Sequence, residues 1–186
     1  MWVFAELARP WHSVESCHMQ ARALHPAPGT AAAPGCVSLQ AAESLTGLSR
    51  RTLWRRVADG TLPRLPADAH GRTMLPLPAV ASHCTLPTTP DLWPLVLAAD
   101  AGQPDAQCEL ALRLLEQHKP AAAQHWLEQA ARHHHPEATH WLALCTLQGW
   151  GRPADEAQGM VWLARAAALG HPVAQAQMAG LRPTSA

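Results

Sequence analysis

The feature that most constrains this chain is a tryptophan–alanine pattern that recurs along its C-terminal half. Residues 126–131 read Trp-Leu-Glu-Gln-Ala-Ala, and residues 162–167, 36 positions later, read Trp-Leu-Ala-Arg-Ala-Ala. Pro136 recurs as Pro172 at the same offset, and a weaker copy begins around Ala98, 32 residues upstream. A fixed period of this length is typical of helical units that stack on one another. The pattern predicts a stack that presents a surface, with the Trp-Leu-x-x-Ala-Ala stripe in its core.

Composition supports a helical protein. The 186 residues include no Ile, Asn or Tyr and a single Phe, so side chains that favour strands are scarce. Hydrophobic residues make up 48% of the chain, which is ample for the core of one or two domains. The missing residue types have A/T-rich codons, which indicates a GC-rich bacterial gene.

Cysteine usage and hydropathy predict a cytoplasmic protein. The five cysteines have neither metal nor disulfide spacing, which is typical of small buried thiols in a reducing compartment. No stretch reaches the length of a membrane span. The apolar start at 1–7 lacks a basic flank and meets Glu6, so it is a poor signal peptide, and Met19 is an alternative start.

Changes in composition divide the chain into four parts. Residues 1–35 are predicted to be a flexible segment and linker, because 25–35 are rich in Pro, Ala and Gly. Residues 36–84 form a small domain, and 85–90 form a second linker. Residues 91–183 form the repeats, with helices expected at about 92–101, 105–116, 120–133, 137–148, 155–169 and 173–181.

The small domain is predicted to contain two short helices joined by a glycine turn. Ser38 begins a helix over 39–45, and Ser49 begins a second helix over 50–58 that ends at Asp59-Gly60. A β-hairpin is expected over 61–76, turning near 68–71, followed by a short helix over 78–84.

Charge separates the two halves of the chain. Residues 36–90 carry six Arg against three acidic residues, whereas 91–186 carry six basic against nine acidic residues. On the second short helix, Leu53 and Val57 share one face and are expected to meet Ala42, Leu45 and Leu48, while Arg51 and Arg55 lie opposite. Such a helix suits the major groove of DNA, where Arg can bind guanine or phosphate. The candidate DNA-binding residues are Arg50, Arg51, Thr52, Trp54, Arg55, Arg56, Arg64 and Arg72.

Residues 38–63 resemble the MerR/excisionase (AlpA-like) winged helix-turn-helix. The shared elements are a small Ala in the first helix, Gly47 in the turn, Ser-Arg-Arg-Thr at 49–52, and Gly-Thr-Leu-Pro at 60–63. The resemblance implies DNA binding, with the second helix in the groove and the wing on the backbone. Because a net charge of +3 is modest, useful affinity is expected to need a homodimer or a partner.

Residues 91–183 resemble Sel-one-like repeats, which are relatives of the tetratricopeptide repeat. The match is carried by Gly149-Trp-Gly151 and the following 162–171 segment. It departs from the family at Ala143 (usually Gly), Thr146 (usually Tyr) and Gly159 (usually Ala). The resemblance implies stacked helix pairs that act as an adaptor for an unidentified protein. The candidate contact residues on the exposed side of each first helix are Gln107, Glu109, Arg113, His140 and Gln148.

The predicted fold is therefore mainly α: a small winged helix-turn-helix, then an α-solenoid of about two repeats and two half repeats. So short an array is expected to pack on the winged domain or on a second copy of itself. The favoured function is a DNA-binding regulator or DNA-linked adaptor. The alternative is a protein–protein scaffold in which the basic helix pairs with acidic residues of the repeats and caps them.

No catalytic constellation is present, so no enzymatic activity and no cofactor are predicted. The His133-His134-His135 run has no Cys or carboxylate at zinc spacing, and we interpret it as an inter-helix loop without a metal.

Overall fold

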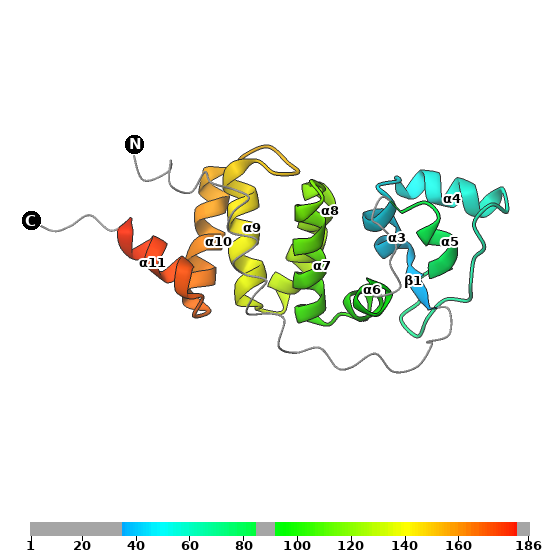
Figure 1. Ribbon diagram of the computed structural model, residues 1–186, viewed down its shortest axis with the longest axis horizontal. Coiled ribbons are helices and arrows are strands. Elements are labelled where there is room, and N and C mark those ends of the chain that lie inside the picture. The colour runs from blue at the N-terminus through cyan, green and yellow to red at the C-terminus, as the bar shows by residue number, and fades with distance from the viewer. Residues whose placement is uncertain (1–34, 85–91, 182–186) are drawn as a thin grey trace, which may run out of the picture. The chain divides into compact units, whose positions relative to one another are not determined.

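The computed structural model describes residues 35–84 and 92–181, which belong to one compact unit. The predicted N-terminal segment, with its alternative start, and the linker at 85–90 lie outside the described residues, apart from Gly35. We refer to residues 35–84 as the basic segment and to residues 92–181 as the helical stack. Figure 1 shows both parts.

The described chain is mainly helical, with one small two-stranded sheet. The basic segment holds β1 (Cys36–Ser38), α3 (Leu39–Thr46), α4 (Arg50–Ala58), β2 (Met74–Pro76) and α5 (Leu77–Ala81). The helical stack holds α6 (Leu92–Asp100), α7 (Pro104–Glu116), α8 (Pro120–Arg132), α9 (Pro136–Gln148), α10 (Glu156–Ala168) and α11 (Pro172–Gly180). The predicted helix bounds are confirmed to within about a turn.

Side-chain caps set the limits of α3 and α4, as predicted. Ser38 Oγ accepts the Ala41 amide N–H at 3.1 Å. Ser49 Oγ accepts the Thr52 amide N–H at 3.3 Å. Each bond satisfies an amide that has no partner within its helix. Between the helices, Gly47 has φ 68°, a left-handed conformation that costs glycine little.

The pairing of the strands differs from the predicted hairpin. The turn at 68–71 is present, since Gly71 N donates to Asp68 O at 3.0 Å. However, β2 pairs antiparallel with β1, in the register Val37↔Leu75, and the hairpin itself has a single bridge, Leu65↔Met74. Val37 and Leu75 are both fully buried. Burial of this pair favours a partner 38 residues away in sequence over the local one.

The core of the basic segment contains most of the predicted contacts. Leu53 is 1% exposed and lies with buried Ala42 and Leu45. Leu48 and Val57, which we expected in the same core, are only partly buried. Leu62, after the end of α4, is buried and its amide bonds Arg56 O at 3.0 Å. The loop that follows α4 thus completes this core.

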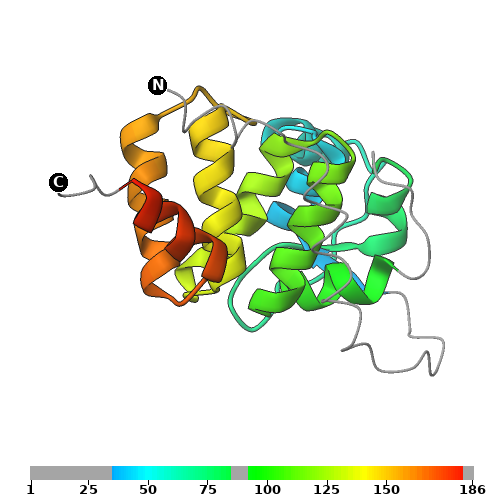
Figure 2. The same cartoon turned by 60° about the vertical axis from the view of Figure 1, so that its left-hand side comes forward.

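In the helical stack, each helix packs on its neighbours in sequence. Contacts join α6 to α7, α7 to α8, α8 to α9, α9 to α10 and α10 to α11. Figures 1 and 2 show this order from two directions, consistent with a repeat stack. The tryptophan–alanine stripe is core in the first copy, where Trp126 is 2% exposed. In the second copy Leu163 and Ala166 are buried against α9 and α11, but Trp162 and Ala167, which we expected in the core, are only partly buried.

Histidines begin two of these helices in the same way. His135 Nδ1 accepts the Ala138 amide N–H at 3.1 Å, and its Nε2 lies 3.0 Å from the Asp105 carboxylate. His171 repeats the arrangement one unit later, with Nε2 2.8 Å from Glu137. Because Nδ1 accepts, Nε2 carries the proton and donates to the carboxylate. These bonds link each repeating unit to the next.

The loop between α9 and α10 lies tightly against the start of α8. Gly151 has φ 82°, and a Cβ there would lie 2.7 Å from Ala121 N. From the same loop, Arg152 donates to Gln124 Oε1 and to Glu128 Oε1, both at 2.6 Å. Gly149 ends α9 and Asp155 begins α10, as predicted.

A cluster of polar contacts, the Asp100 clasp, joins the basic segment to the helical stack. The Asp100 carboxylate accepts Ser38 N at 2.8 Å and Ser38 Oγ at 2.6 Å. Arg72 Nη1 donates to Asp100 O at 3.0 Å and lies 3.6 Å from Asp100 Oδ1. Contacts between α6 and β1 and between α3 and α8 complete the junction. We expected the short stack to pack either on the preceding domain or on a second copy of itself. These contacts show that it packs on the basic segment.

None of the helices in the described ranges has the length and apolar character that would let it cross a membrane.

Candidate nucleic-acid interface

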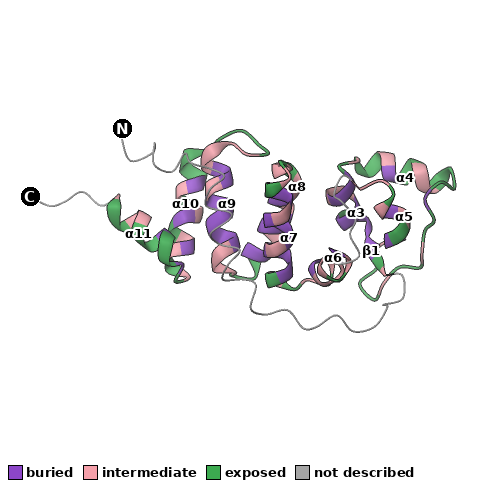
Figure 3. Ribbon diagram, viewed as in Figure 1, coloured by how far each residue is buried: buried purple, intermediate pink, exposed green. Residues whose placement is uncertain are grey.

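The outer face of α4 is basic and open to solvent. Arg50, Arg51 and Arg55 are exposed, and Arg56 is partly buried. Within residues 35–84 and 92–181, none of these four side chains forms an ion pair. Figure 3 shows α4 largely exposed or half-buried, and Leu53 is its single buried residue. The charged face is therefore available to an external anion.

Trp54 extends this face toward the loop over residues 59–73. It is 38% exposed, which is unusual for so large an apolar side chain. The Arg64 guanidinium carbon lies 5.5 Å from the Trp54 ring centroid, within cation–π range. This contact holds a loop arginine beside the helix arginines and adds a fifth positive charge to the same surface.

The start of α4 is occupied by groups of the protein itself. The Thr52 hydroxyl lies 3.0 Å from Ser49 Oγ. The Arg50 amide donates to Glu43 Oε1 at 3.1 Å, which places a carboxylate at the positive end of the helix. A phosphate approaching Thr52 would compete with these bonds, so the middle of α4 is the more open part of the face.

Arg72 is the predicted DNA-binding residue that the structure places elsewhere. Its Nε donates to Asp68 Oδ2 at 2.6 Å, and its Nη1 is held by the Asp100 clasp. The hydrogen bond with Asp68 raises the pKa of Arg72. Desolvation opposes ionisation of Asp68, but hydrogen bonds from Arg72 and His70 outweigh it, and the pKa of Asp68 lies below its usual value. Arg72 therefore supports the junction, and we leave it out of the proposed interface.

The five candidate contact residues of the stack do not form one exposed surface. The expectation of exposure is wrong for Gln107 and His140, which are 4% and 6% exposed. Gln107 Nε2 donates to Ala99 O at 3.0 Å, and the His140 ring stacks on His171 at 4.2 Å. Both side chains lie where neighbouring helices meet, because a helix inside a stack is covered on more than one side.

The other three candidates are at least partly accessible. Arg113 donates to Glu109 Oε1 at 2.8 Å, four residues back on the same helix, and Gln148 is partly buried at the end of α9. An exposed pair of this kind contributes only about 0.5 kcal/mol to stability. These residues are not drawn together into a defined binding site.

Sequence reasoning missed Asp100, the residue that connects the two parts. It is one acidic residue at the end of a helix, with no motif around it, and its partners Ser38 and Arg72 are distant in sequence. The local signal was the cap residue Ser38, whose hydroxyl both accepts from Ala41 and donates to Asp100.

The histidine run behaves as a loop. His134 has φ 60°, at the position where Gly102 and Gly170 have φ 91° and 89°. Among the described residues, no group of three or more His, Cys, Asp or Glu side chains is placed to hold a metal ion.

Comparison with known proteins adds no relative: no family model, no curated protein and no solved structure matches the chain.

Proposed function

We propose that the protein binds double-stranded DNA through α4 and the loop that follows it, as a winged helix-turn-helix regulator or DNA-linked adaptor. The observation that carries the proposal is the exposed arginine face of α4, which is free of internal ion pairs within the described residues. A basic face of this kind also occurs on helices that only contact water. The Arg64 guanidinium stacked on exposed Trp54 is a further positive group beside the face, and it favours the binding of an anion.

In this proposal, Arg51 and Arg55 enter the major groove, and Arg50 and Arg56 lie on the two flanks. Arg64, held against Trp54, acts from the loop as a wing residue on the phosphate backbone. Each phosphate that an arginine neutralises releases condensed counterions, so the affinity should fall steeply with salt. The resemblance of residues 38–63 to MerR/excisionase domains supports the same arrangement.

The helical stack is proposed to be an interaction module of the Sel-one-like type. The Asp100 clasp connects the stack by two hydrogen bonds to Ser38, the residue that begins α3. A protein bound to the stack, or a second copy of the chain, would then bring a second DNA contact into play and raise the affinity of a weak monomer.

The scaffold alternative has one observation in its favour. The basic segment does contact the first helix of the stack, through the Asp100 clasp and through α3 and α8. That alternative also required the α4 arginines to pair with stack carboxylates. Instead, Glu109 bonds Arg113 and Glu128 bonds Arg152. The contact between the basic segment and the stack uses Arg72, and the α4 arginines take no part in it.

The test measures how tightly the full chain binds a fluorescent random-sequence DNA duplex, by fluorescence anisotropy at several salt concentrations. The double variant Arg51→Ala with Arg55→Ala should weaken binding across the whole salt range, whereas Arg64→Ala, which removes a proposed phosphate contact, should reduce the slope of log K against log salt by about 1. Binding that does not depend on salt, or that survives the double variant unchanged, contradicts the proposal.

A matched control separates location from net charge. Arg132→Ala also removes one exposed arginine, at the end of α8 in the helical stack. We expect Arg51→Ala to weaken binding several-fold more than Arg132→Ala. Equal losses would show that the duplex responds to total charge and not to the α4 face.

A further inference from the structure

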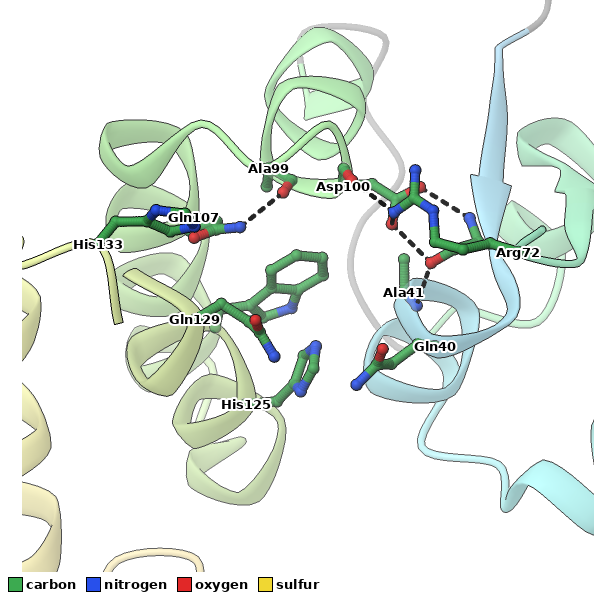
Figure 4. Close-up of a pocket in the computed structure, with 12 residues that line it drawn as sticks. Gln40, Ala41, Arg72, Ala99, Asp100, Gln107, His125, Gln129 and His133 are labelled. Carbon is green, nitrogen blue, oxygen red and sulfur yellow. Dashed lines mark hydrogen bonds and ion pairs between the residues drawn. The ribbon is translucent and has the colours of Figure 1, made fainter. Parts of the chain in front are cut away.

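A polar cleft lies at the junction of the basic segment and the helical stack. It has a volume of about 140 Å³ and lies between α3 on one side and α6, α7 and α8 on the other. In Figure 4, Gln40 of α3 and Gln129 of α8 turn their amide groups toward the gap, and His125 lies beside them. At about 10–15 Å³ per water site, this space suits a molecule of about ten heavy atoms.

Two buried polar atoms belong to residues that line this cleft and have no hydrogen-bond partner among the described residues. They are the Trp126 indole Nε1 and the Gln107 side-chain Oε1. Trp126 and Gln107 are only 2% and 4% exposed. A buried polar atom without a partner costs roughly 1–3 kcal/mol, so it calls for an explanation. Here a donor and an acceptor are left without a partner on two residues that line one cleft, and both atoms lie covered behind its surface.

The charges around the cleft are already balanced. Arg72 and Asp100, the two charged residues of its lining, hold each other through the Asp100 clasp. The remaining polar lining consists of amides, imidazoles, a hydroxyl and an indole. Burial also lowers the pKa of His125, which favours its neutral form. Such a lining suits a neutral ligand, since an ion would find no free opposite charge.

We propose that the cleft binds a small neutral aromatic amide. The amide carbonyl would accept from Trp126 Nε1, the amide N–H₂ would donate to Gln107 Oε1, and the ring would lie near His125 and the Gln40 and Gln129 side chains. Neighbouring atoms cover Trp126 Nε1 and Gln107 Oε1 in this structure, so binding includes a small shift of the side chains around them. The site is independent of the α4 face and does not rest on DNA binding.

The experiment uses nicotinamide as the probe and the full chain labelled with ¹⁵N. With about nine heavy atoms, nicotinamide is expected to bind in the millimolar range. The indole N–H signal of Trp126, assigned from its loss in Trp126→Phe, should shift saturably. Nicotinate, which has the same ring but carries a carboxylate without donors, should bind at least about tenfold more weakly.

The matched control is Trp93→Phe. Trp93 Nε1 is also buried without a partner, but Trp93 does not line the cleft. Trp93→Phe should leave nicotinamide binding unchanged. Gln107→Leu, followed through the same Trp126 signal, should weaken it about tenfold, and the native spectrum of each variant shows whether it is folded. The proposal is overturned if no saturable Trp126 shift occurs up to tens of millimolar nicotinamide, which would leave the cleft to water, or if nicotinate binds equally well.

Discussion

Arg51 and Arg55 of the basic segment face solvent without an ion pair in the described chain, whereas Arg152 of the helical stack is held at 2.6 Å from both Gln124 and Glu128. The same contrast runs through the histidines, since His135 and His171 begin stack helices and donate to carboxylates of the preceding unit. The stack uses several of its polar groups to hold neighbouring helices, while the basic segment pairs Arg72 but leaves the arginines of α4 open. The proposed interface thus differs from the stack surface in gathering several unpaired arginines on one short helix.

The largest effect should come from tight backbone packing in the helical stack. Gly151→Ala should lower the free energy of unfolding by about 4 kcal/mol, because the residue has positive φ and the new Cβ would meet Ala121 backbone at 2.7 Å. Gly47→Ala in the basic segment is the control, with φ 68° but no atom within 4 Å, and should cost about 1 kcal/mol. Urea denaturation followed by circular dichroism measures both. Equal losses of unfolding free energy would mean that both glycine positions accept a Cβ equally well, and that the backbone packing at Gly151 is not tighter than that at Gly47.

The next effect tests whether the two regions unfold together. Asp100→Ala should cost about 3 kcal/mol, because it removes charged acceptors from Ser38 N, Ser38 Oγ and Arg72. In calorimetry, we expect one transition for the wild type and either a lower or a divided transition for the variant. Asp105→Ala serves as the control: it removes one acceptor from His135, but the carboxylate is 98% exposed, so its loss should cost no more than about 1 kcal/mol. If both variants behave alike, the clasp does not couple the regions.

The third effect is a pH dependence of the free energy of unfolding that arises from His140, a residue of the helical stack. Burial, followed by repulsion from His171, lowers the pKa of His140 to about 4. Gln177 and Glu137, which oppose the shift, also face the ring. In the unfolded chain His140 takes up a proton near pH 6.5, but in the folded chain it does so only near pH 4. The folded state therefore keeps its full stability with respect to His140 above pH 6.5 and loses stability as the pH falls toward 4. Between pH 7 and 5, the free energy of unfolding should fall by about 2 kcal/mol.

His140→Gln isolates this contribution, because glutamine can still bond Gln177 but does not titrate. Urea unfolding at pH 7 and pH 5 should show a smaller pH dependence for the variant than for the wild type. A variant that retains the full pH dependence would place the responsible group elsewhere in the chain.

Much of the secondary structure was predictable because its signals are local. Ser38, Ser49 and Asp155 each mark the start of a helix by the type of side chain alone, and Gly149 marks an end. The strand at Cys36–Ser38 was not predicted, since three residues carry no periodicity and the partner strand begins at Met74. The exposed α4 face was predicted for the same local reason as the caps: Arg51 and Arg55 lie opposite Leu53 on one short helix.

By itself, the sequence determined the helices, the caps at Ser38, Ser49 and Asp155, most of the buried tryptophan–alanine stripe and the basic character of α4. These features depend on residues within one or two helical turns of each other, where spacing decides which face is apolar. Only the tertiary structure decided which polar residues remain free. Arg72 is taken by Asp68 and Asp100, whereas Arg51 and Arg55 are not. Asp68 is only four residues from Arg72, but Asp100 and Ser38 come from distant segments, and no local spacing records that these side chains will meet.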